Sequence, residues 1–227
     1  MNTKNSSLAV FDWNSTLLDD APAAYAATNA CLEFFGIAPI SMADLQESFT
    51  FPLIHFYQKA GISVDDYLQN TQSISDIFHT QYNALKQDCP LMNGAIEVLD
   101  FCHAHDIHCM ILSNYNQEPL EADVKRMGIE PYFETISGNR DPEAITSHTN
   151  KYERLRDYMD THGFTPERTF IIGDSHEEPE LAKKLNILGV SISGGLLSPA
   201  RLEKYKKDYV IDCLSELPAI LQKEWTL

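Results

Sequence analysis

Short apolar runs recur along the chain, and most are followed by a longer segment with helical periodicity. The runs have the length and composition of buried strands. They cover residues 8–11, 108–112, 169–173, 187–192 and 208–211. The helical patterns of the same part of the chain cover residues 94–104, 117–127, 149–162, 178–186 and 214–223. Strands that alternate with helices form parallel sheets joined by crossover helices, so the pattern predicts an α/β fold, a doubly wound parallel sheet with a Rossmann-like core.

The interval between the first two predicted strands departs from this alternation. From about residue 20 to residue 89 only helical patterns occur, over residues 24–35, 41–49 and 63–87. The last of these segments opens with a capping signal and is compatible with two helices. Roughly 70 residues of helix is far more than a crossover connection needs. We therefore expect a small all-helical domain inserted after the first strand, with its own bundle of helices.

Composition places the chain among ordinary globular proteins, but its charge is unusual. Hydrophobic residues make up 44% and charged residues 22% of the 227 residues, enough for one core and a smaller second domain. The formal net charge is −16. Such a surface repels phosphate backbones and anionic lipids, so we expect neither nucleic acid nor a membrane as a partner. A small anionic substrate would need a local cation in its binding site.

Other features of the sequence favour the cytoplasm. The apolar runs are all too short to span a membrane, and residues 1–7 lead into the first predicted strand without a separate apolar signal region. The five cysteines are scattered, odd in number and never spaced as C-x-x-C. We expect them to be buried, unpaired side chains in a reducing compartment.

Polar side chains that could take part in catalysis or metal binding follow the predicted strands. Asp12 follows the first run, Ser113 and Asn114 end the second, Asp174 follows the third, and Lys151 lies early in the helix before it. The carboxyl ends of parallel strands meet at one edge of the sheet, where ligands bind, so we expect these side chains to gather there. The alternative for Asp12 is a turn residue that bonds its own backbone, and for Asp174 a helix N-cap.

These residue types suit phosphoryl transfer. Carboxylates are the protein ligands that Mg²⁺ commonly uses together with water and substrate phosphate. A carboxylate can also attack phosphorus and form an aspartyl-phosphate. A hydroxyl group and a lysine can hold the remaining phosphoryl oxygens as charge shifts in the transition state.

The order of these motifs resembles that of the haloacid dehalogenase-like hydrolase superfamily. An aspartate after the first strand, Ser-Asn after a later strand, a lone lysine and then Gly-Asp with further acids occur in that order, and the helical insert lies in the gap that the family's cap occupies. The chain thus resembles the branch with a helical cap of type one, the phosphoglycolate-phosphatase-like branch, over essentially its whole length. The resemblance implies a core of residues 1–19 and 91–227 and a cap of residues 20–90.

The resemblance also implies a function and a metal site. The expected function is that of a Mg²⁺-dependent phosphatase that acts on a small phosphorylated metabolite, as a monomer or a homodimer. Asp12 matches the family nucleophile and a metal ligand, and Asn14 matches the second acid of that motif, whose main-chain carbonyl also binds the metal. Asp174 matches the metal-binding acid of the last motif. Glu178 matches its second acid, one methylene longer than the usual aspartate.

The remaining matches concern the phosphate and the catalytic set. Ser113 matches the phosphate-binding hydroxyl, with Asn114 beside it, and Lys151 matches the lysine that steadies the nucleophile and the phosphoryl group. The resemblance therefore implies a catalytic set of four residues: Asp12, Asn14, Ser113 and Lys151.

Position 14 departs most from the family pattern. The usual aspartate protonates the leaving alkoxide and later activates water, whereas an amide cannot exchange a proton at neutral pH. We therefore expect a slow phosphatase, unless another group such as His176 supplies the proton. Ser15 also stands where glycine is common, which costs energy if the turn needs a positive φ.

Two alternatives remain open at this stage. Asn14 is compatible with a catalytically impaired family member that binds a phosphorylated ligand or a protein partner. A minor alternative is a hydrolase of phosphonate carbon–phosphorus bonds, whose branch uses a cap lysine as a Schiff base. Lys59 and Lys86 are the lysines that the insert offers for that role.

Overall fold

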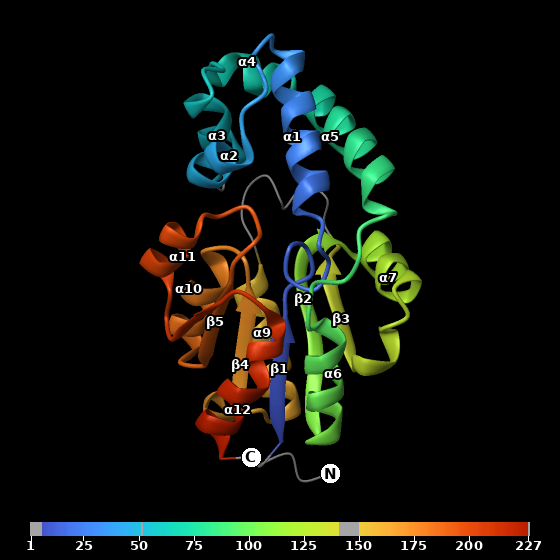
Figure 1. Ribbon diagram of the computed structural model, residues 1–227, viewed down its shortest axis with the longest axis vertical. Helices are drawn as coiled ribbons and strands as arrows, with labels where there is room; N and C mark the ends of the chain where they lie inside the picture. Colours follow the sequence, from blue (N-terminus) through green and yellow to red (C-terminus); the bar gives the residue numbers. More distant parts are fainter. Residues whose placement is uncertain (1–5, 51, 141–149, 227) are drawn as a thin grey trace.

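A computed structural model describes residues 6–50, 52–140 and 150–226 of the chain. In this part of the chain one parallel sheet has the strand order β3-β2-β1-β4-β5-β6 (Figure 1). The strands are β1 (Ser7–Phe11), β2 (Ile107–Asn116), β3 (Thr135–Asn139), β4 (Thr169–Gly173), β5 (Leu188–Ile192) and β6 (Tyr209–Ile211). Strand β1 lies at the centre, where the order of strands reverses, which confirms the predicted doubly wound sheet.

Strand β3 has no counterpart among the predicted strands. Its sequence, TISGN, contains one large apolar residue, and its first three residues are only partly buried. It lies at the edge of the sheet, beside β2. An edge strand with one covered side does not need the continuous apolar run that marks a central parallel strand. The apolar pattern therefore predicted the other five strands and missed this one.

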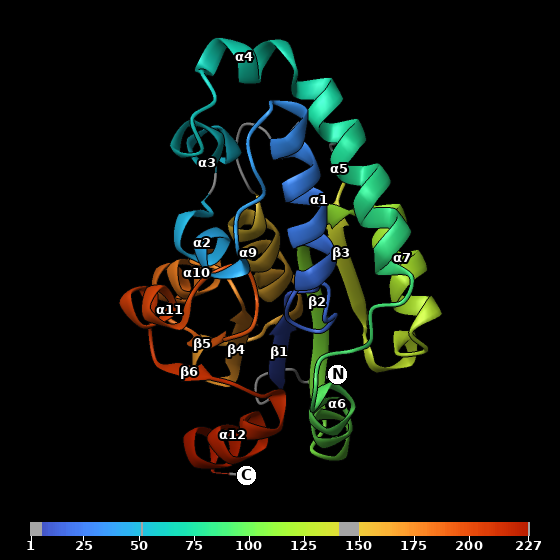
Figure 2. The same cartoon turned by 45° about the horizontal axis from the view of Figure 1, so that its top comes forward.

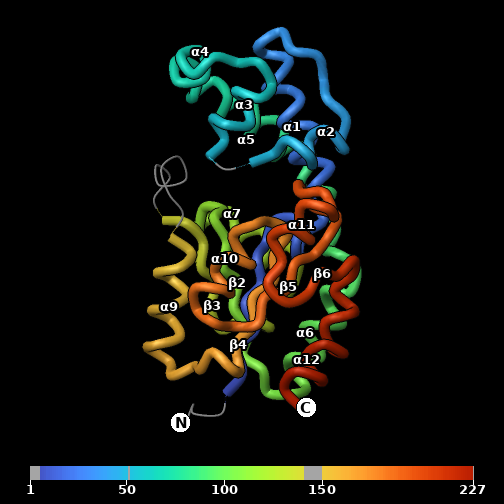
Figure 3. The backbone as a smooth tube through the Cα atoms, turned by 90° about the vertical axis from the view of Figure 1, so that its left-hand side faces the viewer, coloured from blue at the N-terminus to red at the C-terminus, as the bar shows by residue number. Residues whose placement is uncertain are grey.

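Helices cover both faces of the sheet, as alternation along β1 requires. Leu8 and Val10 pack on one face, and Ala9 and Phe11 pack on the other. The first face is covered by α9 (Lys151–His162) and α10 (Glu177–Leu185). The second is covered by α6 (Ala95–Ala104), α7 (Gln117–Arg126) and α12 (Leu217–Trp225). Figure 3 shows α9 on one side of the sheet and α6 with α12 on the other.

The predicted core helices thus each have an observed counterpart. Residue 149, the first of the predicted segment 149–162, lies outside the described residues. Within the described residues the core also contains the 3₁₀ turns η2 (Glu130–Tyr132), η3 (Pro166–Arg168) and η4 (Leu214–Glu216) and the helix α11 (Pro199–Tyr205).

The segment between β1 and α6 is helical and lies beyond the carboxyl ends of the strands (Figures 1 and 2). Its helices are α1 (Ala21–Phe34), α2 (Met42–Ser48), α3 (Leu53–Lys59), α4 (Val64–Gln69) and α5 (Thr71–Lys86). The predicted segment 63–87 is two helices that meet at Asn70. Ser41 and Ser63 cap α2 and α4 by accepting backbone hydrogen bonds. That residues 20–90 form a domain separate from the core stays a prediction.

The helical unit α1–α5 contacts the core on two sides of the sheet edge. Gln46 on α2 donates to the carbonyl of Gly195 at 2.8 Å, and Arg201 on α11 donates to the carbonyl of Phe49 at 2.7 Å. At the far end of α5, Lys86 forms a buried ion pair of 2.8 Å with Asp123 on α7. These contacts hold the unit over the edge where the predicted site lies.

The cysteines are free, as the sequence predicted. Cys31, Cys102 and Cys109 are buried as expected, but Cys89 and Cys213 are partly exposed, so the expected burial is wrong for these two. Among the described residues, no helix combines the length and the apolar character that a membrane crossing would need.

Candidate active site

Asp12 lies directly after β1, at the carboxyl edge of the sheet. Its backbone N–H donates to the carbonyl of Ile172 on β4 at 2.9 Å, which continues the pairing of the two strands. The residue is 8% exposed. Burial raises the pKa of Asp12 to about 6, against the opposing effect of the Lys151 ammonium group. The strand register therefore places a buried carboxylate at the switch point of the sheet.

Lys151 begins α9, on the face of the sheet that α9 and α10 cover, and its side chain reaches the same point. Its Nζ lies 3.1 Å from Oδ1 of Asp12, 2.7 Å from Oε1 of Glu178 and 3.7 Å from Oε2 of Glu177. The residue is 3% exposed. Burial lowers its pKa, but the nearby carboxylates, those of Asp12 and Glu178 foremost, raise it overall. The amine is therefore held as an ammonium ion that bridges the predicted nucleophile and the acids of α10.

Glu178 is fully buried in the first turn of α10. Its Oε1 accepts from Lys151, and its Oε2 accepts from the hydroxyl of Ser175 at 2.7 Å. Burial alone would raise the pKa of Glu178, but the Lys151 charge and these hydrogen bonds lower it below its usual range. Both oxygens have protein donors, so in this geometry Glu178 positions Lys151. Its predicted part in metal binding stays a prediction.

Gly173 is required by this arrangement, and its replacement tests it. A Cβ at position 173 would lie 2.4 Å from Cγ and Cδ of Glu178. Gly173→Ala must therefore displace Glu178 from Lys151, and we expect a loss of about 1–3 kcal/mol of stability, the usual cost of overpacking. Urea unfolding would measure this loss. In a Glu178→Ala background the added cost should shrink, and an equal cost in both backgrounds would contradict the clash.

Asp174 follows β4, and the loop after β5 closes on it. The backbone N–H of Leu196 donates to its Oδ2 at 3.1 Å. A Cβ at Gly195 would lie 2.0 Å from the same oxygen, so only glycine permits this approach. Burial, followed by the charges of Asp12 and Glu178, raises the pKa of Asp174 well above its usual range. The two aspartates that the sequence assigned to the metal are thus near enough to repel each other.

Ser113 and Asn114 lie where β2 passes the site. Ser113 is 2% exposed, and its Oγ accepts from the backbone N–H of Tyr115 at 3.2 Å, a bond that does not use the hydroxyl hydrogen. Asn114 donates from Nδ2 to Oε2 of Glu177 at 2.7 Å. Asn114 therefore joins the acids around Lys151 through Glu177, a residue that sequence reasoning did not assign to the site.

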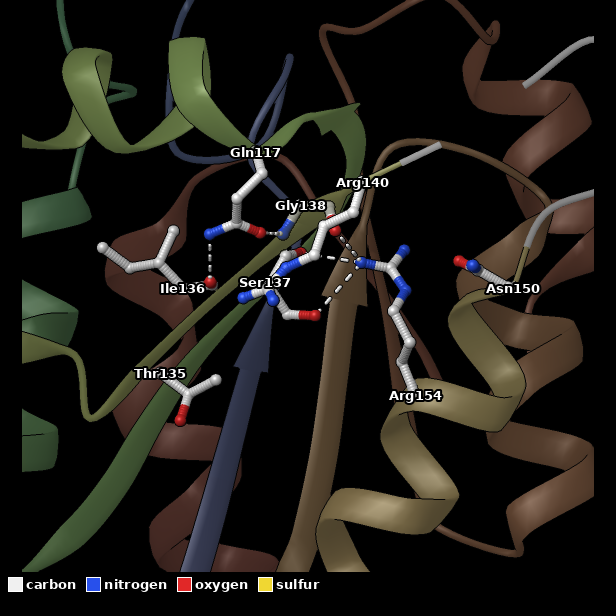
Figure 4. Close-up of a pocket in the computed structure, with 8 residues that line it drawn as sticks. All are labelled: Gln117, Thr135, Ile136, Ser137, Gly138, Arg140, Asn150 and Arg154. Atoms are coloured by element: carbon white, nitrogen blue, oxygen red, sulfur yellow. Dashed lines mark hydrogen bonds between the residues drawn. The ribbon is translucent and has the colours of Figure 1, made fainter. Parts of the chain in front are cut away.

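Arg154 is a second residue that sequence reasoning missed. One turn after Lys151, it donates to the carbonyls of Ser137 and Gly138 from Nη1 and to that of Ser113 from Nη2, each at 2.9 Å. Figure 4 shows it beside a pocket of about 360 Å³ along β3. The pocket is lined by Gln117, Thr135, Ile136, Ser137, Gly138, Arg140, Asn150 and Arg154. Arg154 therefore ties α9 to β2 and β3 and supports the main chain at Ser113.

The side chain of Asn14 turns to a partner that the sequence did not single out. Its Nδ2 donates to Oδ2 of Asp20 at 2.6 Å and to the hydroxyl of Tyr82 at 2.8 Å. Ser15, next in the chain, has the positive φ of 53° that a glycine would adopt at lower cost. Asp20 is only six residues from Asn14, whereas Tyr82 is 68 residues away and no local signal connects them.

His176 and Lys86, two further residues that sequence analysis considered, have surroundings that differ from the predicted roles. The ring of His176 packs against that of Tyr205, with centroids 5.6 Å apart. Lys86 donates to the hydroxyl of Tyr115 at 2.5 Å and to Asp123 at 2.8 Å. Burial lowers the pKa of Lys86, but these two contacts raise it overall. A Schiff base needs a neutral amine, so this environment does not favour Lys86 for that chemistry.

The oxygen atoms at this edge fit a magnesium ion better than a softer metal. Within the described ranges, no group of three or more histidine, cysteine, aspartate or glutamate side chains is arranged as a metal site. Mg²⁺ needs fewer, because one or two carboxylates with water and substrate phosphate complete its coordination. Asp12 and Asp174 supply two carboxylates that repel each other, and the main-chain carbonyl of Asn14, two residues after Asp12, is a third oxygen donor.

The doubly wound sheet carries a buried aspartate and a buried lysine at its carboxyl edge, where α/β enzymes bind their ligands. The chain belongs to the haloacid dehalogenase-like hydrolase family, whose sequence model matches residues 9–192. The match extends from β1 to the end of β5 and includes Asp12, Lys151 and Asp174. The resemblance inferred from the motifs is therefore confirmed.

Relatives and structural neighbours agree with this assignment. The chain is 23% identical over 208 residues to the phosphoglycolate phosphatase of Synechococcus elongatus, covering 92% of this chain and 93% of the relative. It is 26% identical over 113 residues to the pyrophosphatase PpaX of Bacillus mycoides, about half of each chain at 50% and 51%. A predicted phosphatase from Clostridium acetobutylicum has the same fold, with a TM-score of 0.77, 17% identity and coverage of 96% and 99%.

Proposed function

We propose that this protein is a Mg²⁺-dependent phosphatase that hydrolyses a small phosphorylated metabolite through an aspartyl-phosphate on Asp12. The observation that carries the proposal is the contact of 3.1 Å between Lys151 Nζ and Asp12 Oδ1 at the switch point of the sheet. An ammonium ion at that place favours the ionised, nucleophilic form of the carboxylate and can hold a phosphoryl oxygen. The phosphatase names of two relatives support the same reaction class.

The residues of this chain would divide the work as follows. An oxygen of Asp12 forms a bond to phosphorus while the bond from phosphorus to the leaving oxygen breaks. Lys151 and the hydroxyl of Ser113 hold the phosphoryl oxygens as negative charge develops on them. Asp12, Asp174 and the main-chain carbonyl of Asn14 would hold Mg²⁺, which supplies charge stabilisation when bound. Water then attacks the phosphorus of the aspartyl-phosphate and releases inorganic phosphate and the Asp12 carboxylate.

Asn14 sets the substrate preference in this proposal. Its amide cannot protonate an alkoxide, and loss of general-acid help costs about 10²- to 10⁴-fold. A good leaving group, such as the acetate of acetyl phosphate, needs little protonation. The protein is therefore a slow phosphatase biased toward activated phosphates.

The helical unit α1–α5 would act as the cap of this enzyme. It lies over the carboxyl edge of the sheet, where its closure would exclude water from the reaction and choose the substrate. We place the cap at residues 20–90 and the enzyme in the cytoplasm.

A phosphate-release assay tests the proposal. The purified protein is offered acetyl phosphate, p-nitrophenyl phosphate and a set of alkyl phosphates, each with and without Mg²⁺. We expect release that depends on Mg²⁺ and is fastest on acetyl phosphate. Ligand-dependent stabilisation without any turnover would instead favour the catalytically impaired binding protein, the second candidate, which the amide at Asn14 supports.

Asp174→Ala tests the metal site without an activity measurement. The melting temperature of the natural protein should rise with Mg²⁺, because the ion binds the folded state only. In Asp174→Ala this rise should disappear, since one of the two carboxylates is lost. Titration of the melting temperature against Mg²⁺ makes the comparison. An unchanged rise in the variant would contradict the assignment of Asp174.

A further inference from the structure

Asp20 is a buried carboxylate with a full set of hydrogen-bond donors. It is 1% exposed and lies just before α1. Its Oδ1 accepts from the backbone N–H of Ser15 at 2.6 Å and from the hydroxyl of Ser15 at 3.1 Å. Its Oδ2 accepts from Nδ2 of Asn14 at 2.6 Å and from the hydroxyl of Tyr82 at 2.5 Å. Such a buried carboxylate needs these donors, and it orders the groups that supply them.

The contacts of Asp20 decide which way the Asn14 amide faces. A carboxylate has only acceptor atoms, so the atom of Asn14 that lies 2.6 Å from it must be the nitrogen. The second hydrogen of that nitrogen goes to the hydroxyl of Tyr82 at 2.8 Å. Both amide hydrogens are then in use. In any hydrogen bond between the Asn14 side chain and a bound molecule, the molecule must therefore donate and Oδ1 of Asn14 must accept.

Asn14, Tyr82 and Asp20 form a closed cycle of three hydrogen bonds, in which Asn14 donates twice and Asp20 accepts twice. Asn14 donates to the hydroxyl of Tyr82, that hydroxyl donates to Asp20, and Asn14 also donates to Asp20. Tyr82 comes from α5, whereas Asn14 comes from the loop after β1. The cycle therefore connects the helical unit to the loop that follows the predicted nucleophile.

We propose that Asp20 is a positioning residue of the active site, which fixes Asn14 with its amide oxygen available to the substrate side and couples that orientation to the docking of α5. Asn14 and Asp20 pair an amide with a carboxylate, and their atoms Nδ2 and Oδ2 lie 2.6 Å apart. We call them an exchanged pair, because the amide and the carboxylate could change places between positions 14 and 20 and keep this contact. The part about substrate rests on the proposed function, whereas the pairing itself does not.

The pairing predicts what happens when an acid is restored at position 14. Asn14→Asp alone would place two carboxylates 2.6 Å apart in a buried site, where like charges repel. Asp20→Asn alone would face Nδ2 of Asn14 with a second amide nitrogen. The double variant Asn14→Asp/Asp20→Asn reverses the cycle. Asn at 20 then donates to Tyr82 and to the new carboxylate, while its oxygen still accepts from Ser15.

The experiment compares four proteins by melting temperature and by turnover of acetyl and alkyl phosphates. We expect each single variant to melt about 4–10 °C lower, as for a broken buried, charge-assisted hydrogen bond in a chain of this size. The double variant should recover more than half of the summed loss, because the two sites are coupled. Its turnover of alkyl phosphates relative to acetyl phosphate should rise by about 10-fold or more, since position 14 then carries an acid.

The control and the contrary outcomes are separate from the test of the proposed function. Glu33→Gln removes the same charge from an exposed position on α1, and its melting temperature should stay within about 1 °C of the natural protein. Melting losses that simply add in the double variant would overturn the exchanged pair. With an active natural protein, an unchanged preference between the two substrates would overturn the positioning role. No phosphate release from any variant would refute the phosphatase proposal, while the melting temperatures still decide the pairing.

Discussion

Asp12→Asn is expected to abolish phosphate release, with a loss on the order of 10⁴- to 10⁶-fold, as for the removal of other enzymatic nucleophiles. The amide has nearly the shape of the carboxylate but cannot attack phosphorus and form the aspartyl-phosphate. Asp12 lies at the end of the central strand, within 3.1 Å of Lys151. Release of inorganic phosphate from acetyl phosphate at saturating Mg²⁺ measures the effect.

The fold of Asp12→Asn should survive the change. Lys151 keeps Glu178 as a partner at 2.7 Å, and the backbone bond from position 12 to Ile172 involves no side chain. Circular dichroism and the melting temperature check this expectation. A folded variant with turnover near that of the natural protein would show that the reaction does not pass through this carboxylate.

Lys151→Met should have the largest effect on stability. The change leaves the carboxylates of Asp12, Glu177 and Glu178 without the one cation within 4 Å that the described structure gives all three. Removal of one partner from a buried ion pair costs about 3–5 kcal/mol, because the remaining charge stays buried and unpaired. Urea unfolding at neutral pH measures the loss, and phosphate release should fall with it.

Two comparisons separate the charge of Lys151 from its bulk. Lys151→Arg keeps the positive charge and should lose less stability than Lys151→Met, although the larger guanidinium group does not fit the same space. The loss in Lys151→Met should also be smaller at acidic pH. Without the ammonium ion, burial raises the pKa of the carboxylates in the folded state, so protonation at low pH relieves their repulsion. Equal losses for both variants at both pH values would assign the effect to packing.

The edge of the sheet could be predicted from sequence because its signals are local. A continuous apolar run such as residues 8–11 is typical of a strand buried on both faces, and a polar residue directly after it lies at the carboxyl end. The parallel order of strands then brings Asp12, Ser113 and Asp174 to one edge. Strand β3 could not be predicted in this way, because this edge strand has no such apolar run.

The supporting contacts of Lys151 could be predicted only in part. Its position before β4 was readable from the order of motifs, but its partners depend on the first turn of α10, where Glu177 and Glu178 both face it. Gly173 and Gly195 matter for a reason that a sequence does not express. Each leaves a space that the side chain of another residue fills, Glu178 in one case and Asp174 in the other.

The sequence by itself determined the fold class, the helical insert and the residues at the strand ends, because strand burial, helix periodicity and capping act over a few neighbouring residues. Only the tertiary structure decided what Asn14 does. From the sequence alone, Asn14 shows only that the acid expected at this position is missing. In the folded chain the carboxylate of Asp20 lies 2.6 Å from the Asn14 amide. Tyr82, which is 68 residues from Asn14 in the sequence and lies on α5, closes the cycle. Hydrogen bonds between distant segments depend on the packing of α5 against the core, which no local pattern records.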